Sequence, residues 1–254
     1  MVIRFSVCVE MIFRELPFLE RLERVAAAGL PAFEFWRIAD KDVEAIRAKK
    51  EELGLACAAF MGTGGVPLVD ASRRADYLAA LRDALGVARQ LDCRTLLVTT
   101  GQAMPERSRG EQHAAVVAAL REGARLCEDA GVTLVLEPLN VLVDHKGYYL
   151  ETSAEGFQIL DEVGSPAVKL LYDIYHQQIT EGNLISTITA NVAKIGHLHV
   201  ADVPGRHEPG TGEINYRNVF RAIDAAGYAG YVGLEYRPAA DAAATLTVVR
   251  ELAE

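Results

Sequence analysis

The stretch GVTLVLEPLN, residues 131–140, decides how the rest of the chain is interpreted. A short run of apolar and β-branched residues between turn residues is typical of a strand that is buried on both faces. The run ends on Glu137, and Pro138 stops the strand directly afterwards. A buried carboxylate is costly unless a metal ion, a hydrogen bond or a proton compensates for its charge. The end of this strand therefore predicts a functional site.

The same arrangement recurs three times further along the chain. The strand-like runs VKLLYD, IGHLHVAD and YVGLEY carry Asp173, His199 and Glu235 at or near their ends. Counted from Glu137, these residues are separated by 36, 26 and 36 positions, each about one strand-plus-helix unit. Three carboxylates and one imidazole that meet at the carboxyl ends of parallel strands would form an oxygen-rich site for a divalent metal ion.

Strand and helix patterns alternate along the whole chain, which predicts a single-domain α/β protein over residues 1–254, folded as a (β/α)8 TIM barrel. The rival, a doubly wound open sheet, needs fewer strands and, when it binds dinucleotides, a glycine-rich first turn. We expect strands at Ile3–Val9, Ala32–Trp36, Leu55–Phe60, Thr95–Thr100, residues 131–137, Val168–Asp173, Ile195–Val200 and Val232–Glu235. We expect helices at Leu16–Ala28, Asp40–Leu53, Ser72–Leu91, Glu111–Ala130, Thr152–Val163, from about 174 to Val192, Tyr216–Ala226 and Ala240–Ala253.

Several helix starts carry residues that commonly cap helices. We expect Asp40 and Ser72 to cap the helices that follow them. We expect Thr152 or Ser153 to cap the helix that runs to residue 163, with Glu155 placed to complete a capping box with Thr152.

Composition and charge exclude several classes of protein. Half of the residues are apolar and 24% are charged, as in ordinary globular domains. A formal net charge of −9 argues against a nucleic-acid partner. The first residues lack the features of a signal peptide, and no apolar run is long enough to span a membrane, so we expect a cytoplasmic protein. The cysteines stand alone and are expected to be buried, reduced thiols: Cys8, Cys57, Cys93 and Cys127.

The ligand types favour particular metals and a particular chemistry. Hard oxygen ligands with a single imidazole favour Mn²⁺ or Mg²⁺, although Co²⁺ or Zn²⁺ could occupy the same ligands. Glu137 and Glu235, on the fifth and eighth strands, would place a carboxylate on each side of a substrate. A metal that chelates a carbonyl and the adjacent hydroxyl stabilises an enediolate while a glutamate moves the carbon-bound proton. This is the chemistry of aldose–ketose isomerisation, or of epimerisation next to a carbonyl.

Several motifs, in order, resemble the hydroxypyruvate isomerase family of the xylose-isomerase-like barrel superfamily. These motifs are FRELPFLERLERVAAAGLPAFEF, EPLN, GYYLETSAEGFQIL, LLYDIYHQQITEGNL, GHLHVADVPGRHEPGTGEINYRNVF and GLEYRP. The resemblance implies that the metal ligands are Glu137, Asp173, His199 and Glu235, with the two glutamates as the acid/base pair. It also implies that His176 contacts substrate oxygens near the metal, and that Arg206 binds the carboxylate or hydroxyl end of the substrate.

The chain departs from the related ketose 3-epimerases in two places. Those enzymes carry a further glutamate shortly after EPLN, near where Val143 stands here, with Asp144 and His145 following. We count His145 among the substrate-binding candidates. Glu10 stands where a small polar residue is expected, so the floor of the pocket is expected to differ.

Several other residues near the predicted site can be interpreted as structural. His197 lies deeper in its strand than His199 and is expected to be structural. Trp36 and Phe60 end their strands at the barrel mouth, where core packing and a hydrophobic wall over the substrate are equally favoured. The GTGGVPL loop lacks the Gly-Lys-Ser/Thr ending of a phosphate-binding loop and is interpreted as a lid or rim.

These observations predict a metal-dependent isomerase that converts hydroxypyruvate to tartronate semialdehyde. The alternatives are a ketose 3-epimerase, or an isomerase of another sugar or sugar acid such as an oxo-tetronate. A DNA-repair endonuclease on this barrel needs more metal-binding histidines and a basic groove, which a negative chain with six histidines does not favour. A non-catalytic binding protein is disfavoured because every expected ligand is present. The superfamily resemblance implies a homodimer or homotetramer with a small-molecule substrate.

Overall fold

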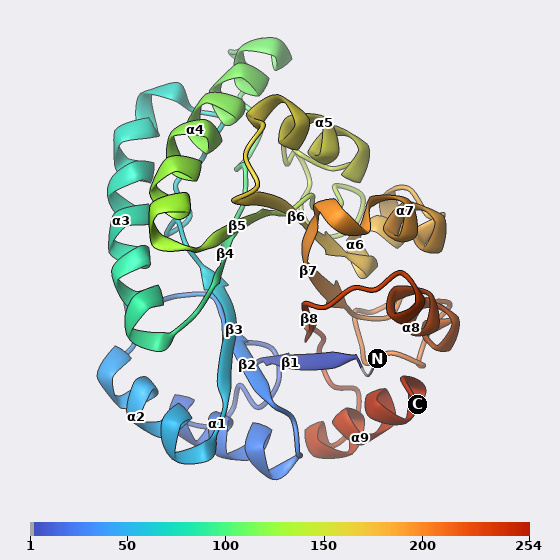
Figure 1. Ribbon diagram of the computed structural model, residues 1–254. Coiled ribbons are helices and arrows are strands. Elements are labelled where there is room, and N and C mark those ends of the chain that lie inside the picture. Colours follow the sequence, from blue (N-terminus) through green and yellow to red (C-terminus); the bar gives the residue numbers. More distant parts are fainter. Residues whose placement is uncertain (1–2) are drawn as a thin grey trace.

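The computed structural model describes residues 3–254, which form a closed barrel of parallel strands with helices around the outside (Figure 1). The predicted (β/α)8 barrel is confirmed. The strands are β1 (Arg4–Cys8), β2 (Ala32–Phe35), β3 (Ala56–Met61), β4 (Thr95–Val98), β5 (Thr133–Leu136), β6 (Val168–Asp173), β7 (Ile195–Val200) and β8 (Tyr231–Leu234). The helices are α1 (Phe18–Ala27), α2 (Val43–Leu53), α3 (Arg74–Leu91), α4 (Arg109–Ala130), α5 (Ser153–Val163), α6 (Ile174–Thr180), α7 (Leu184–Asn191), α8 (Tyr216–Ala225) and α9 (Ala242–Leu252), with short 3₁₀ turns at Ala71–Arg73 and Val192–Lys194.

The barrel closes where β1 pairs with β8. Ser6 stands opposite Gly233 in this parallel pair. Phe5 packs on the outside of the barrel against Phe220 of α8, with ring centroids 5.5 Å apart. Because side chains alternate along a strand, Ser6 points into the barrel. The same alternation sends Glu235, two residues beyond Gly233, to the mouth.

The interior of the barrel is divided into an apolar part and a polar part. On β3 to β6, a small buried cluster fills the interior: Ala59, Leu97, Val135 and Leu171. On β1, β2 and β7, the inward side chains Ser6, Glu34 and His197 are polar and buried. A packed interior without a channel is normal for this fold, but buried charge requires partners. The polar part lies directly beneath the predicted metal ligands.

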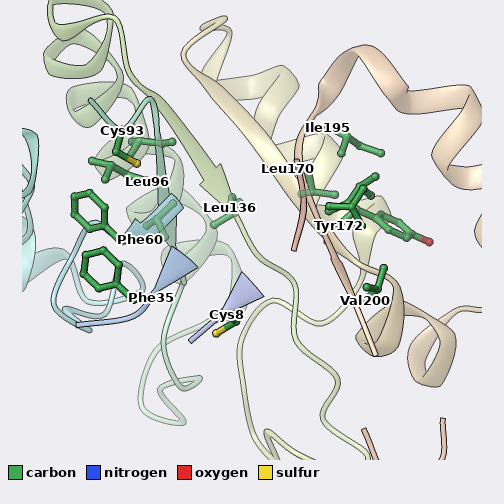
Figure 2. Packing of buried hydrophobic residues seen from close by; sticks show 14 of the residues in the cluster. Cys8, Phe35, Phe60, Cys93, Leu96, Leu136, Leu170, Tyr172, Ile195 and Val200 are labelled. Carbon is green, nitrogen blue, oxygen red and sulfur yellow. The ribbon is translucent and has the colours of Figure 1, made fainter. Parts of the chain in front are cut away.

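The main hydrophobic core lies between the strands and the surrounding helices (Figure 2). Phe60 is fully buried there and stacks on Phe35, with centroids 5.2 Å apart. An aromatic pair of this kind contributes about 0.5–1.5 kcal/mol beyond its buried area. Phe60 therefore belongs to the core, and the interpretation as a wall over the substrate is wrong for it. The four cysteines are buried free thiols, as predicted.

Two helices begin later than the sequence suggests. The cap of α2 is Asp42, whose carboxylate accepts from the backbone N of Ala45 (3.0 Å), rather than Asp40. Asp40 instead pairs with Lys41 at 2.8 Å. The turn before α3 is capped by Asp70, whose carboxylate accepts from the backbone of Ser72 at 2.9 Å, so Ser72 is not the cap.

Two other helices differ from the prediction, one in its start and one in its capping box. Helix α4 begins at Arg109 because Ser108 and Glu111 form a reciprocal capping box, which extends the helix by two residues. Thr152 caps α5 as predicted, but only half of its capping box forms. The Glu155 side chain turns away from the cap to Arg109 and to the hydroxyl of Tyr149.

The long helix predicted after β6 is two helices. Gly182 (φ 64°) and Asn183 (φ 51°) both adopt the left-handed conformation and separate α6 from α7. Left-handed backbone ends a helix, and Gly and Asn are the residues that tolerate it best. In residues 3–254, no helix combines the length and the apolar character required to cross a membrane.

Candidate metal centre and active-site cleft

A cleft of about 730 Å³ opens at the carboxyl ends of the strands. Every strand except β6 sends a residue from its end, or from the loop that follows, to the lining, and α6, directly after β6, contributes His176. The loop after β3 contributes Gly64 and Gly65, in agreement with the interpretation of GTGGVPL as a rim. Catalytic residues of this fold are supplied at this face.

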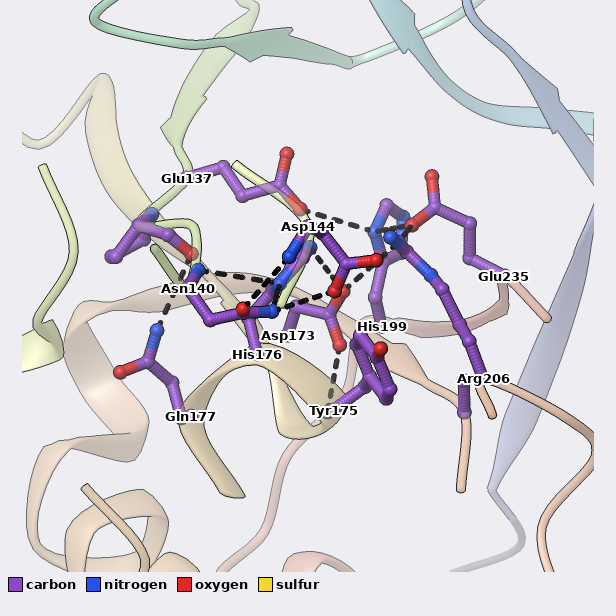
Figure 3. A network of polar contacts seen from close by, with 12 residues as sticks. Glu137, Asn140, Asp144, Asp173, Tyr175, His176, Gln177, His199, Arg206 and Glu235 are labelled. Atoms are coloured by element: carbon purple, nitrogen blue, oxygen red, sulfur yellow. Dashed lines mark hydrogen bonds and ion pairs between the residues drawn. The ribbon is translucent and has the colours of Figure 1, made fainter. Parts of the chain in front are cut away.

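The structure brings the four predicted ligands together at the base of this cleft, where Glu137 and Glu235 belong to its lining. One ligand atom from each of Glu137, Asp173, His199 and Glu235 lies within 4.8 Å of the others, and all four residues are buried. His199 Nδ1 lies 3.6 Å from Glu137 Oε1 and 3.5 Å from Glu235 Oε2 (Figure 3). Three of these side chains come from strand ends, and His199 comes from one residue before the end of β7.

The donor set fits a divalent cation. Three carboxylates and a single imidazole are the ligands that Mn²⁺ or Mg²⁺ would accept. His199 Nδ1 is buried without a hydrogen-bond partner among the described residues and faces the carboxylates. A buried polar atom without a partner is costly, and a bound metal ion would satisfy this one.

Without a metal, the carboxylates and cations of the site shift one another's pKa values. Burial alone would lower the pKa of His199, but the charges of Glu235 and Glu34 raise it well above its ordinary value. Burial would raise the pKa of Glu235, yet His199 and Arg206 hold it well below its ordinary value. Burial raises the pKa of Asp173 to about 7, with Arg206 opposing the shift and Glu235 adding to it. In the metal-free site, His199 is thus protonated and Glu235 is ionised at neutral pH.

Arg206 lies among the carboxylates of the predicted metal site. Its guanidinium contacts Glu235 and lies 3.5 Å from Asp173 Oδ2, and it stacks over the Tyr175 ring at 5.0 Å (Figure 3). The residue has φ of 57°, a left-handed conformation that is uncommon for a non-glycine residue. Its carbonyl accepts from the backbone N of Arg237 (2.8 Å), which ties the loop after β7 to the loop after β8. This backbone conformation, held by its surroundings, sets the direction in which the side chain leaves the main chain.

His176 is held by Asn140 in a defined tautomer. Asn140 Oδ1 accepts from the backbone N of Val143 (2.9 Å), and Nδ2 donates to Asp144 Oδ2 (2.8 Å). The amide is thereby oriented so that Nδ2 also donates to His176 Nδ1 at 2.7 Å. His176 therefore carries its proton on Nε2, which lies 3.5 Å from Asp173 Oδ2. Burial and the charge of Arg206 lower the pKa of His176 well below its ordinary value, so the ring is neutral.

The segment after EPLN also reaches the cleft. Asp144 and His145 both line it, and the His145 ring lies 5.2 Å from that of His176. Glu10, in contrast, is not among the residues that line the cleft and pairs with Lys41 at 3.1 Å. The expectation that Glu10 changes the pocket floor is wrong, because this side chain turns toward Lys41 and toward Arg21 of α1.

Two residues of the site are not predicted as polar partners from the sequence. Trp36 lines the cleft, and its Nε1 donates to Glu235 Oε1 at 3.0 Å, so this indole is a polar partner as well as a wall. Glu34, at 2% exposure, lies in the polar part of the barrel interior beneath the ligands. The signal for Glu34 was a carboxylate inside the strand AFEF, where its neighbours are all apolar.

Glu34 gathers the histidines of β7. His197 Nε2 donates to Glu34 Oε2 at 2.8 Å, and His199 Nε2 lies 2.9 Å from Glu34 Oε1. Burial alone would raise the pKa of Glu34, but His199 and His197 lower it to about 2. His197 is thus buried against a carboxylate below the cleft. This position is consistent with the structural role that we expect for His197.

A model of the xylose isomerase-like TIM barrel family matches residues 22–252, and the chain belongs to this family. The chain is 35% identical over 244 residues to hydroxypyruvate isomerase of Escherichia coli, covering 93% of this chain and 94% of that protein. It is 34% identical over 251 residues to 2-oxo-tetronate isomerase of Cupriavidus necator, covering 96% of both. A crystal structure described as AP endonuclease, family 2, from Brucella melitensis superposes with a TM-score of 0.93 at 30% identity, covering 98% of both chains. The expected resemblance to hydroxypyruvate isomerases is confirmed.

Proposed function

We propose that the protein is a divalent-metal-dependent isomerase that interconverts hydroxypyruvate and tartronate semialdehyde. One observation carries the proposal. The carboxylates of Glu137 and Glu235, which follow β5 and β8, line one cleft and lie 3.6 Å and 3.5 Å from the same imidazole nitrogen of His199. The two curated relatives, both isomerases of small oxo-acids by name, support the same class of reaction.

The ligands for the ion would be Glu137, Asp173, His199 and Glu235, and Mn²⁺ or Mg²⁺ suits them best. When bound, such an ion supplies positive charge that stabilises an enediolate. The cluster is buried at the base of the cleft, so a substrate that reaches it is largely removed from water. Electrostatic interactions with developing charge are stronger in such a place than in water.

The two glutamates would perform the proton transfer. One removes a proton from C3 of hydroxypyruvate, which leaves the electron pair in an enediolate spanning C2 and C3. A proton is then delivered to C2, and the proton of the C3 hydroxyl passes to the C2 oxygen, so that C3 becomes the aldehyde and C2 carries the hydroxyl. The product has the same atoms as the substrate, so neither an oxidant nor water is consumed. Each proton transfer by a positioned side chain contributes about 10²–10⁴-fold to the reaction rate.

His176 and Arg206 would orient the substrate. The Nε2–H of His176 is available to a substrate oxygen because Nδ1 is already engaged by Asn140. Arg206 is close enough to the carboxylate cluster to bind the acid end of a substrate that reaches the metal ligands. Arg37 and Arg237 also line the cleft and add to its attraction for anions. An oxo-acid therefore suits this cleft better than a neutral ketose.

A second substrate, 2-oxo-tetronate, is favoured by the size of the cleft. A volume of about 730 Å³ is more than a three-carbon acid needs. The two curated relatives differ by a single percentage point of identity, so sequence similarity does not choose between the substrates. An abasic-site endonuclease is less consistent with a chain of net charge −9, despite the structural likeness to the Brucella protein.

A substrate panel tests the proposal. Protein loaded with Mn²⁺ is incubated with hydroxypyruvate, 2-oxo-tetronate, fructose, tagatose, ribulose and an abasic-site duplex, and products are separated by chromatography. We expect the highest kcat/KM for hydroxypyruvate, with loss of at least about 100-fold in Glu235→Gln. A higher kcat/KM for 2-oxo-tetronate would change the assigned substrate and leave the proposed reaction mechanism unchanged. Turnover of only the neutral ketoses, or cleavage of the duplex, would contradict the proposal.

A further inference from the structure

We infer that Glu34 is a positioning residue that fixes the orientation and tautomer of His199, so that Nδ1 presents its lone pair to the metal ion. This inference rests on the metal site proposed above. Glu34 itself lies below the cleft and is not among the residues that line it. It would act on the metal only through the His199 ring.

The His199 ring lies between Glu34 and the metal ligands. Its Nε2 is 2.9 Å from Glu34 Oε1, whereas Nδ1 faces Glu137 and Glu235 at the other side of the ring. The two atoms lie at hydrogen-bonding distance, but the contact is too bent to count as a formed hydrogen bond, and neither atom has another hydrogen-bond partner among the described residues. A neutral imidazole carries one proton, so a carboxylate beside Nε2 favours the tautomer in which Nδ1 is free to ligate.

The Glu34 carboxylate is itself held in place from two other strands. Ser6 Oγ on β1 donates to Oε2 at 2.9 Å, and His197 Nε2 on β7 donates to the same oxygen at 2.8 Å. With Oε2 fixed, Oε1 has a defined position under His199. A carboxylate can accept from all of these donors because it has two oxygens and about four lone-pair sites.

Gly233 on β8 leaves the space that this contact requires. A Cβ atom at residue 233 would lie 2.4 Å from Glu34 Oε1 and 2.6 Å from His199 Cδ2. Any larger side chain there would push the carboxylate and the ring apart. Side chains or gaps from β1, β2, β7 and β8 therefore combine to place one oxygen beside one ring nitrogen.

Glu34→Gln tests the inference with little change in volume. Glutamine has one acceptor oxygen where the carboxylate has two, and its amide N–H groups would face an imidazole N–H. Because Ser6 and His197 both donate at the Oε2 position, the amide oxygen is expected there, and the N–H group is expected beside His199 Nε2. His199 must then carry its proton on Nδ1, and a ring protonated on Nδ1 does not ligate. Ser6→Ala is the matched control, since it removes a buried hydrogen bond to Oε2 and leaves the Oε1 contact with His199.

The primary readout is the affinity of metal-free protein for Mn²⁺, measured by titration calorimetry. We expect binding to weaken by about 10–100-fold in Glu34→Gln. We expect Ser6→Ala to stay within about threefold of wild type, because Glu34 keeps its contacts with His197 at Oε2 and with His199 at Oε1. Circular dichroism and thermal unfolding establish that each variant is folded. If Glu34→Gln does not fold, Glu34→Asp, which retracts the carboxylate by one methylene, replaces it and is expected to bind at least about fivefold more weakly.

The second readout is the ¹⁵N chemical shifts of the His199 ring in Mg²⁺-loaded protein. We expect a single tautomer protonated at Nε2 in wild type and in Ser6→Ala, and loss of that tautomer in Glu34→Gln. Wild-type Mn²⁺ affinity and an unchanged tautomer in Glu34→Gln would overturn the inference while the metal site stands. Absence of Mn²⁺ and Mg²⁺ binding by the wild type would overturn the proposed metal site and the inference with it.

Discussion

Arg206→Met removes a cation from a site that holds several buried carboxylates. The guanidinium contacts Glu235 and lies 3.5 Å from Asp173 Oδ2, and only 13% of the Arg206 side chain is exposed. Removing one partner of a buried ion pair costs about 3–5 kcal/mol, because the remaining charge has lost its compensation. For a chain of this size, that loss corresponds to roughly 6–20 °C in the melting temperature of metal-free protein.

The same substitution should strengthen metal binding. A metal ion needs the carboxylates that Arg206 now contacts, so the guanidinium opposes its entry by like-charge repulsion. Two unit charges about 4 Å apart repel by about 4 kcal/mol at an effective dielectric constant near 20. Because the arginine side chain can move away, we take about tenfold tighter binding, or ~1.4 kcal/mol, as the smallest expected change.

The assay pairs scanning calorimetry of metal-free protein with a calorimetric titration of Mn²⁺. Arg206→Lys is the matched control, since it keeps the charge and should stay closer to wild type in both measurements. Saturating Mn²⁺ should restore most of the stability lost in Arg206→Met, because the ion replaces the missing positive charge. Unchanged melting of metal-free Arg206→Met, or weaker binding of Mn²⁺, would refute this reasoning.

Two further predictions concern helix packing and protonation. Gly86 lies at an exposed position of α3 with no atom near the place of a Cβ, so Gly86→Ala should raise the free energy of unfolding by about 0.5–1 kcal/mol in urea titrations. Gly123 lies on α4, where a Cβ would be 2.2 Å from the Tyr77 hydroxyl. Gly123→Ala should therefore lower the free energy of unfolding by more than about 1 kcal/mol. Equal changes in the free energy of unfolding for the two alanine variants would contradict this prediction. Metal binding should release protons at neutral pH and tighten between pH 6 and 8, because the pKa of His199 is raised and that of Asp173 is about 7 in metal-free protein, so protons bound there must leave. Titrations in buffers of different ionisation enthalpy measure this release, and an affinity independent of pH would argue against it.

The meeting of the four candidate ligands could be predicted from the sequence because each one follows a local rule. Glu137 and Glu235 come directly after short buried runs, and Asp173 and His199 lie at or near the ends of others. Parallel strands then bring such ends to one face of the barrel. The spacing along the chain was therefore sufficient to predict that these residues meet.

Glu34 could not be predicted as a partner of the site, because its role depends on contacts far apart in the sequence. Its partner His197 is 163 positions away, and no local pattern connects the two. Other differences did have local signals. The run from Ser108 to Glu111 has the spacing of a capping box, and Gly182 with Asn183 is a turn signal inside an apparently continuous helix.

The most direct test of the proposed chemistry is proton exchange in D₂O, followed by NMR on Mg²⁺-loaded protein with hydroxypyruvate as substrate. We expect tartronate semialdehyde carrying deuterium at C2, and deuterium at C3 of recovered hydroxypyruvate, with both lost in Glu137→Gln and in Glu235→Gln. Isomerisation that persists in both variants, or no exchange with any oxo-acid despite bound metal, would contradict the assignment of these two glutamates as the proton-transfer pair.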